Sequence, residues 1–576
     1  MKGKYFSIFL LLAIGISALF TGCFSSWQGD KAVLSINFGG SSRSAAWPPD
    51  EFTQATLEHH IQLEGPSGIQ NHTFEPGVSS ASFTLVPGHW TIKAESFLDK
   101  ELYAKGSAGV ELKPGRNNPV SIKMNFAGKE DRVYMDVNTW EELKTAVEGT
   151  NAYSTFITLK GTSMTANSAI TLDNPMQYIY LWADAPGGIT ITRDSSFTGI
   201  FFRIYSGVLT MGGDEDQQSY EPITLHGGGQ TAAPLKSTII YNRSGIFYLI
   251  GGTITENNGS AFGGVENNGT FYMYAGEISY NNSAPTGTTG SGGVFNTGTF
   301  YMEAGSISYN TSSANGGGVL NTGTFSMNAG EIKNNTSVAG DVGGGGVFNQ
   351  GGTFYMNGGE ISYNTSSSNG GGVLNFKTFY MEAGEISNNT ASDNGGGMYN
   401  NGTFIMNAGE ISYNNAGNNG GGVHNESTFA MEAGEISDNT SSVNGGGVYN
   451  SAFGKFQMAG GSLSGNTAGS NGNGVYYNDD VYSNSTFAMS GSAYLAPGDD
   501  LCLAAGTMIT VTDLLTAREP QSPLFEITLG SVPASGTSLQ VLISDPPGYE
   551  SEFAQFQCTS DGINYGIDSD GFVHIP

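Results

Sequence analysis

Between Gly245 and Ser490, apolar and polar residues recur in a fixed order. Each copy reads Thr-Phe-x-Met, then Glu-Ile-Ser, then Gly-Val-x-Asn, with glycine and asparagine clusters between these pieces. The apolar centre of the middle piece recurs, mostly at 25-residue intervals, at Ile278, Ile307, Ile332, Ile361, Ile386, Ile411, Ile436 and Leu463. A fixed period of this size predicts a solenoid in which each copy forms one turn.

Apolar and polar residues alternate within each short piece. This alternation predicts strands with one buried face, and the Gly and Asn clusters predict turns between them. Three strands and three turns per copy predict one rung of a right-handed parallel β-helix, with rungs about 4.8 Å apart. The predicted fold class is all-β, with about 25 residues per repeat.

Three columns of apolar residues are predicted to stack inside the solenoid, because no rung can bury its own apolar side. The first is Phe271, Phe300, Phe325, Phe354, Phe379, Phe404, Phe429, Phe456 and Phe487, and the second is Met273, Met302, Met327, Met356, Met381, Met406, Met431, Met458 and Met489. The third is Val265, Val294, Val319, Val347, Val373, Met398, Val423, Val448 and Val475.

Two columns of asparagine accompany them, and we expect turns of left-handed geometry and amides bonded along each column. One column is Asn281, Asn310, Asn335, Asn364, Asn389, Asn414, Asn439 and Asn466. The other is Asn296, Asn321, Asn349, Asn375, Asn400, Asn425 and Asn450.

The pattern changes outside the repeats. Residues 31–127 contain six or seven short alternating runs, which predict an immunoglobulin-like β-sandwich. Residues 135–244 open with the capping box Thr139-Trp140-Glu141-Glu142, which predicts a helix that covers the end of the solenoid, followed by irregular rungs. Regular repeats occupy 245–490, and 491–576 are expected to form the final rungs and a C-terminal cap.

Residues 1–23 have the organisation of a secretory signal. Lys2 and Lys4 precede an apolar run, and the run ends in Phe20-Thr21-Gly22-Cys23. These four residues resemble a bacterial lipobox, which predicts cleavage and lipidation at Cys23. An uncleaved anchor and an ordinary signal peptide remain alternatives. Because Phe24 is not Asp, the resemblance points to the outer membrane or cell surface, with lipid-mediated membrane association.

The sequence of the repeat resembles that of known protein families. Ile-Ser-x-Asn and Gly-Gly-Gly-Val are similar to the repeats of chlamydial polymorphic outer-membrane proteins. The whole chain, including Gly-Gly-Gly-Val-Tyr-Asn at Gly445–Asn450, looks more like β-helix lipoproteins of spirochaetes and some gut bacteria. The resemblance implies the pectate-lyase-like superfamily, which includes lyases, glycosidases and adhesins, and therefore leaves the activity open.

The charge balance narrows the choice of ligand. The net charge of −29 disfavours nucleic acid, and Lys333, Lys377 and Lys455 are the basic residues between Ser244 and Ser490. Glutamates recur in the column Glu277, Glu331, Glu360, Glu385, Glu410 and Glu435. Three readings stay open for it: a solvated surface column, a calcium or magnesium column at Glu360, Glu385, Glu410 and Glu435, and a catalytic carboxylate pair. No cofactor is predicted, with calcium as a candidate.

Tyrosines at predicted outward positions are the candidate ligand-binding residues. One set, Tyr272, Tyr301, Tyr355 and Tyr380, lies between Phe and Met, and another, Tyr280, Tyr309, Tyr363 and Tyr413, follows Ile-Ser. Aromatic faces suit sugar rings and protein partners, although stacking between rungs is the alternative.

These observations favour a lipid-anchored, non-enzymatic, adhesin-like rod that binds a glycan or a host or neighbouring protein. The alternative is a polysaccharide lyase or glycoside hydrolase with its site in the irregular rungs 152–244. A purely architectural role is a third reading. The charged residues that would serve an enzyme there are Lys160, Arg193, Asp194, Arg203, Asp214, Glu215, Asp216 and His226.

Overall fold

A computed structural model shows an all-β chain that divides into two units, Met1–Asp131 and Arg132–Pro576. The structure describes residues 32–37, 58–75, 78, 80–98, 101–113, 117–120, 124–126, 132–150, 154–175, 177–213, 221–229, 235–284, 290–338, 340, 343–478, 485–503, 508–515, 525–529, 538–544, 547, 553, 556–560, 563–565 and 567–574. The predicted signal segment and Cys23 lie outside these residues.

The first unit contains two β-sheets that share one core, as a sandwich requires. One sheet has the order β4-β1-β7 and the other β3-β2-β5-β6-β8. Trp90 lies fully buried among side chains from both sheets, including Leu34 and Ile61. The strands are β1 (Ala32–Asn37), β2 (Glu58–Gly65), β3 (Gly68–Phe74), β4 (Ser80–Leu85), β5 (Gly88–Leu98), β6 (Glu101–Leu112), β7 (Asn117–Val120) and β8 (Met124–Phe126).

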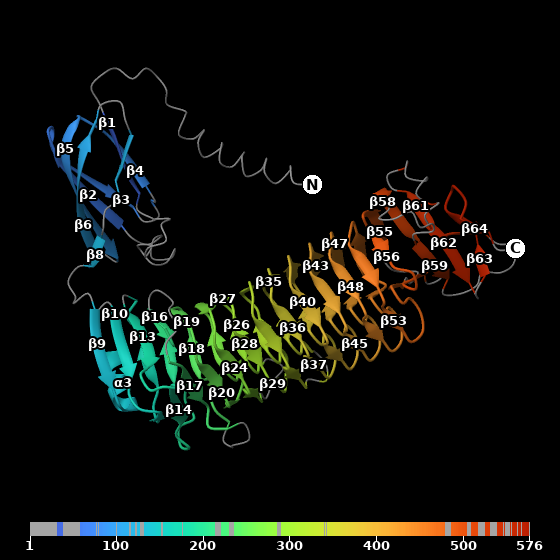
Figure 1. The fold of residues 1–576 in the computed structure, drawn as a ribbon, viewed down its shortest axis with the longest axis horizontal. Coiled ribbons are helices and arrows are strands. Elements are labelled where there is room, and N and C mark those ends of the chain that lie inside the picture. Colours follow the sequence, from blue (N-terminus) through green and yellow to red (C-terminus); the bar gives the residue numbers. More distant parts are fainter. Residues whose placement is uncertain are drawn as a thin grey trace. The chain divides into compact units, whose positions relative to one another are not determined.

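The second unit is a parallel β-solenoid of the right-handed type, with about 14 turns of about 26 residues (Figure 1). It opens with β9 (Arg132–Val137) and helix α3 (Trp140–Gly149). The Thr139 hydroxyl accepts a hydrogen bond from the Glu142 amide, so the predicted helix start is confirmed. Trp140, Leu143 and Val147 are buried in the solenoid core, and α3 packs against the first strands of the solenoid.

One complete turn shows how the repeat folds. β35 (Thr353–Met356) belongs to a first sheet, β36 (Glu360–Ser362) to a second, and β38 (Val373–Asn375) to a third. Between the last two lies β37 (Thr365–Ser366), which belongs to a fourth sheet of two-residue strands that the sequence did not predict. The inward side chain of β37 is Ser366, which is too small and polar to mark a strand in a hydrophobicity pattern.

The second sheet carries the glutamate column. Its strands are β11 (Ser163–Ala166), β14 (Ile189–Arg193), β17 (Ile223–His226), β20 (Thr253–Thr255), β24 (Glu277–Ser279), β28 (Ser306–Ser308), β32 (Glu331–Lys333), β36, β40 (Glu385–Ser387), β44 (Glu410–Ser412), β48 (Glu435–Ser437), β52 (Ser462–Ser464) and β56 (Tyr494–Leu495). Each strand pairs in parallel with the next, so equivalent residues of successive turns are direct neighbours.

The three predicted apolar columns form the core. Every member of the Phe, Met and Val columns is at most 1% exposed. Successive phenylalanine rings from Phe271 to Phe487 stack with centroids 4.6–5.1 Å apart. This core is continuous because each turn places the same side chain above its predecessor.

Both asparagine columns are buried amide ladders, which confirms the predicted bonding. Along the first column, Asn364 Nδ2 donates to Asn389 Oδ1 at 3.0 Å, and Asn389 Nδ2 donates to Asn414 Oδ1 at 3.0 Å. The expected left-handed geometry lies one residue earlier, at the position before this column. The side chain of the asparagine is therefore used for the ladder, and its neighbour makes the turn.

The solenoid ends in a different type of pairing. β57 (Leu501–Leu503), β59 (Phe525–Leu529) and β62 (Phe556–Ser560) continue the third sheet, and β62 then pairs antiparallel with β63 (Ile563–Tyr565). Cys502 and Cys558 are buried and free, and burial raises the pKa of each thiol to about 12. No helix in the described part of the chain is long and apolar enough to span a membrane.

Candidate functional site

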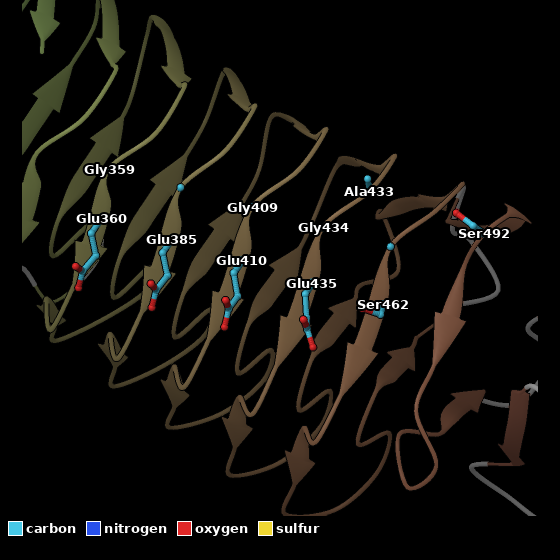
Figure 2. Close-up of a pocket in the computed structure, with 12 residues that line it drawn as sticks. Gly359, Glu360, Glu385, Gly409, Glu410, Ala433, Gly434, Glu435, Ser462 and Ser492 are labelled. Atoms are coloured by element: carbon cyan, nitrogen blue, oxygen red, sulfur yellow. The ribbon is translucent and has the colours of Figure 1, made fainter. Parts of the chain in front are cut away.

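Glutamates of successive turns line an open groove on the second sheet. Glu360, Glu385, Glu410 and Glu435 are register partners on β36, β40, β44 and β48. Figure 2 shows their side chains projecting in the same direction from successive strands. The groove has a volume of ≈ 830 Å³ and is lined by Gly359, Glu360, Gly384, Glu385, Gly409, Glu410, Ala433, Gly434, Glu435, Gly461, Ser462 and Ser492. We call it the acidic groove.

The glycines of the acidic groove are required by the turn that precedes each glutamate. Gly384 has a φ of +92°, a region that side chains disfavour. A Cβ atom there would lie 2.7 Å from Met356 Cε and 2.7 Å from the Gly359 carbonyl oxygen of the preceding turn. Close packing therefore selects glycine, and the wall beside each carboxylate carries no side chain.

The carboxylates differ along the column. Towards its ends they have partners: Ser308 Oγ donates to Glu277 at 3.1 Å, Lys333 pairs with Glu331, and Ser464 Oγ donates to Glu435 at 2.8 Å. In the centre, the carboxylates of Glu385 and Glu410 accept no hydrogen bond from a described residue.

The serines beside the central carboxylates are buried without a partner. The hydroxyls of Ser362, Ser387 and Ser412 make no hydrogen bond, and all three residues are 0% exposed. Ser308 and Ser464 show that a serine of this column can reach the glutamate one turn earlier. The central glutamates therefore extend towards the groove and leave that bond unmade.

The described residues do not form a ready cage of ligands at the predicted calcium or magnesium column. Among the described residues, no group of three or more His, Cys, Asp or Glu could hold a metal ion. Each gap between turns of the acidic groove offers the carboxylates of two glutamates, whereas calcium takes six to eight oxygen ligands.

The tyrosines that follow Ile-Ser occupy a strained position. Tyr280, Tyr309, Tyr363 and Tyr413 have φ between 53° and 55° and are 44–59% exposed. Left-handed backbone costs about 1 kcal/mol or more for residues other than glycine and asparagine. Tyr280 and Tyr309 stack with centroids 4.9 Å apart. Further along, asparagine takes the place of tyrosine at Asn334 and Asn388, so Tyr363 and Tyr413 do not follow one another on adjacent turns.

The tyrosines between Phe and Met form two stacked groups on the first sheet. Tyr272 and Tyr301 stack at 4.8 Å, and Tyr355 and Tyr380 stack at 5.2 Å. Ser326 is the register partner of both Tyr301 and Tyr355 and interrupts the series. Tyr355 is 38% exposed. These tyrosines therefore stack between turns, and Tyr355 is also exposed to solvent.

Lys160 and Arg193, two of the charged residues of the irregular rungs, make structural contacts. Lys160 lies 3.2 Å from Asp136 and 3.0 Å from Asp184. Arg193 is 4% exposed, and burial lowers the pKa of its guanidinium to about 10. Arg193 donates to the carbonyl oxygens of Gly199, Gly227 and Ser237 and to the side chain of Asn257.

The other described residues of this set make local contacts of their own. Asp194 accepts from Ser196, and His226 Nδ1 accepts from the Gly228 amide. Arg203 is half-buried on β15 (Phe202–Ile204). Asp214, Glu215 and Asp216 lie outside the described residues.

One histidine site escaped the sequence reasoning. His424, on β46 (Val423–Asn425), stacks between Tyr399 at 4.9 Å and Tyr449 at 4.7 Å, and its Nε2 lies 2.8 Å from Glu426. The His424 bond lowers the pKa of Glu426. The sequence did contain a signal for this site. His424 replaces an aromatic residue of the Tyr399 and Tyr449 column, and Glu426 follows two residues later.

No family model, no curated protein and no solved structure matches this chain.

Proposed function

We propose that this protein is a non-enzymatic binding rod of the cell envelope, whose ligand lies along the second sheet of the solenoid. The observation that carries the proposal is the acidic groove: Glu360, Glu385, Glu410 and Glu435 repeat in register beside glycine walls. A site that repeats once per turn suits a ligand that also repeats. A glycan chain or an extended protein surface meets that condition.

The uniformity of the groove favours binding over turnover. Acid–base catalysis needs two groups whose different environments separate their pKa values. Glu385 and Glu410 are related by the repeat and have nearly the same surroundings, with a glycine before each and an isoleucine and serine after each. The two carboxylates therefore lack the asymmetry that assigns one as acid and the other as nucleophile or base.

The envelope location rests on the sequence. A lipidated Cys23 would tether the chain to a membrane without a spanning segment, and the resemblance to a lipobox supports the outer membrane or cell surface as the proposed location. The net charge of −29 favours cationic or neutral partners over nucleic acid and anionic lipid.

One assay tests this function. The whole chain, with Cys23→Ala to prevent lipidation, is incubated with immobilised neutral, acidic and cationic polysaccharides, and retained protein and released reducing ends are both measured. We expect retention without product. Retention should weaken in Tyr363→Asn or Glu385→Gln and stay unchanged in Asp393→Asn, a charge change elsewhere in the same turn. Released product that scales with protein would refute a non-enzymatic rod.

A further inference from the structure

Resting on the proposed binding function, we propose that Tyr363 and the amides on either side of it, Asn334 and Asn388, bind neutral sugar rings of a glycan. One sugar ring would lie over Asn334, between Tyr309 and Tyr363. A second would lie over Asn388, between Tyr363 and Tyr413. We call these five residues the tyrosine corner, since they occupy equivalent left-handed positions in successive turns.

The backbone holds the tyrosine corner in register. The Tyr363 amide donates to the Ser387 carbonyl oxygen of the next turn at 3.2 Å, and the same bond recurs at every position of the corner. Turns follow at about 4.8 Å, so the tyrosines that flank one asparagine start from positions about 9.6 Å apart. Tyr280 and Tyr309, on adjacent turns of the same column, stack at 4.9 Å. A ligand ring over an asparagine therefore takes the place in the column that a tyrosine would otherwise fill.

Tyr363 is strained and exposed, and the fold gains no contact from it that would explain the strain. Its φ is 55°, which is costly for a side chain other than glycine or asparagine, and it is 57% exposed. Its side chain makes no hydrogen bond or ring contact with a described residue. Less costly residues fit here, since the same position holds Asn334, Asn388 and, further along, Gly465 with a φ of 67°. Backbone strain that serves no internal contact is characteristic of functional positions.

The amides beside Tyr363 are available to a ligand. The side chains of Asn334 and Asn388 are partly exposed and make no hydrogen bond with a described residue. The amides that follow them in the chain, Asn335 and Asn389, are instead buried and used by the amide ladder. A free amide offers two donors and one acceptor oxygen. A ring over either asparagine thus meets hydrogen-bonding groups as well as tyrosine.

This combination selects a neutral sugar. A pyranose ring has apolar C–H faces that suit tyrosine and hydroxyl groups at its edge that suit an amide. A phenylalanine side chain of a protein partner would also stack, but it would leave the amides unpaired. The residues of the tyrosine corner are uncharged, and Glu360 and Glu385 precede Tyr363 and Asn388 by three residues. A sugar that carries a carboxylate would therefore be repelled.

Calorimetry of the whole chain carrying Cys23→Ala tests the assignment. The probes are neutral oligomers of glucose, mannose and galactose, a uronic-acid oligomer of the same length, and a phenylalanine-containing peptide. We expect a neutral oligomer to bind most tightly. Tyr363→Asn should bind it roughly tenfold more weakly, because one ring that contacts both sugars is lost. Asn388→Gly, which introduces the residue found at Gly465, should bind roughly threefold more weakly.

Thermal melts of the same variants separate binding from a structural role. Tyr363→Asn relieves left-handed strain, so it should raise the melting temperature while it weakens binding. Loss of binding together with a lower melting temperature would assign Tyr363 a structural role and overturn the proposal. The matched control is Asn407→Ala, which removes an amide outside the tyrosine corner and should bind as the parent does.

The remaining outcomes also decide. Failure of all three neutral oligomers to bind overturns the assignment, and tighter binding of the peptide assigns the tyrosine corner to a protein partner. If Tyr363→Asn binds a glycan as the parent does while Glu385→Gln binds it more weakly, the ligand lies in the acidic groove. The binding rod then stands and this inference fails. If no polysaccharide or oligomer is retained by the parent chain, both proposals fail.

Discussion

Replacement of one buried asparagine should destabilise the solenoid strongly. Asn389 is 0% exposed, and its Nδ2 donates to the Ile361 carbonyl oxygen at 2.8 Å and to Asn414 Oδ1 at 3.0 Å. Its Oδ1 accepts from the amide of Asn364 at 2.9 Å and from Asn364 Nδ2 at 3.0 Å. Asn389→Ala removes these four bonds and leaves two donors of Asn364 buried without an acceptor.

The expected cost follows from those two donors. Each buried donor without a partner costs about 1–3 kcal/mol, so Asn389→Ala should lower the free energy of unfolding by about 2–6 kcal/mol. The matched control is Asn407→Ala, in which an exposed amide loses a 2.8 Å bond to Glu382 and about 0.5 kcal/mol or less.

Urea unfolding followed by circular dichroism measures both variants. Because repeat arrays can open locally, hydrogen exchange of the neighbouring turns is recorded as well. We expect a large shift of the urea midpoint and faster exchange around Asn364 and Asn414 for Asn389→Ala. Equal shifts for the two variants would refute the view that the amide ladder stabilises the stack.

Three further predictions follow from single positions. Asp499 accepts from Asn466 at the end of the amide ladder, and burial raises the pKa of its carboxyl, so the folded state is penalised as pH rises through that pKa. Asp499→Asn should therefore raise the melting temperature at neutral pH and not at acidic pH below the unfolded-state pKa; the same gain at both would contradict this. Tyr363→Asn should stabilise the chain by about 0.5–1 kcal/mol in thermal melts by relieving left-handed strain, and a lower melting temperature would be the opposing result. Cys23→Ala should abolish incorporation of labelled fatty acid, whereas retention of the label would exclude Cys23 as its site.

The repeat made most of the solenoid predictable. Identical side chains recur at a fixed interval, so the residues that stack, such as Phe354 on Phe379, follow from the period alone. The fourth sheet did not follow, because most of its two-residue strands bury serine or alanine, as at Ser366, and carry no strong apolar signal. The left-handed position was misplaced by one residue because asparagine is suited to either role.

The sequence predicted which glutamates form the column but not which bonds each of them makes. The Glu360–Glu435 column and its register follow from the period, and the acidic groove contains those four residues. Which carboxylates are already bonded does not follow, because Ser464 reaches Glu435 whereas Ser412 makes no bond. The interruption of the tyrosine series at Ser326 is visible in the sequence, whereas the stacking of Tyr355 on Tyr380 required the structure.

Binding along the second sheet is tested by mapping where a retained polysaccharide lies on the chain. Hydrogen exchange of the whole protein is compared with and without that ligand. We expect protection at the turns that contain Glu360, Glu385 and Glu410, with no change in residues 154–229. Protection confined to the irregular rungs around Arg193, accompanied by product release, would contradict the binding rod and favour an enzyme.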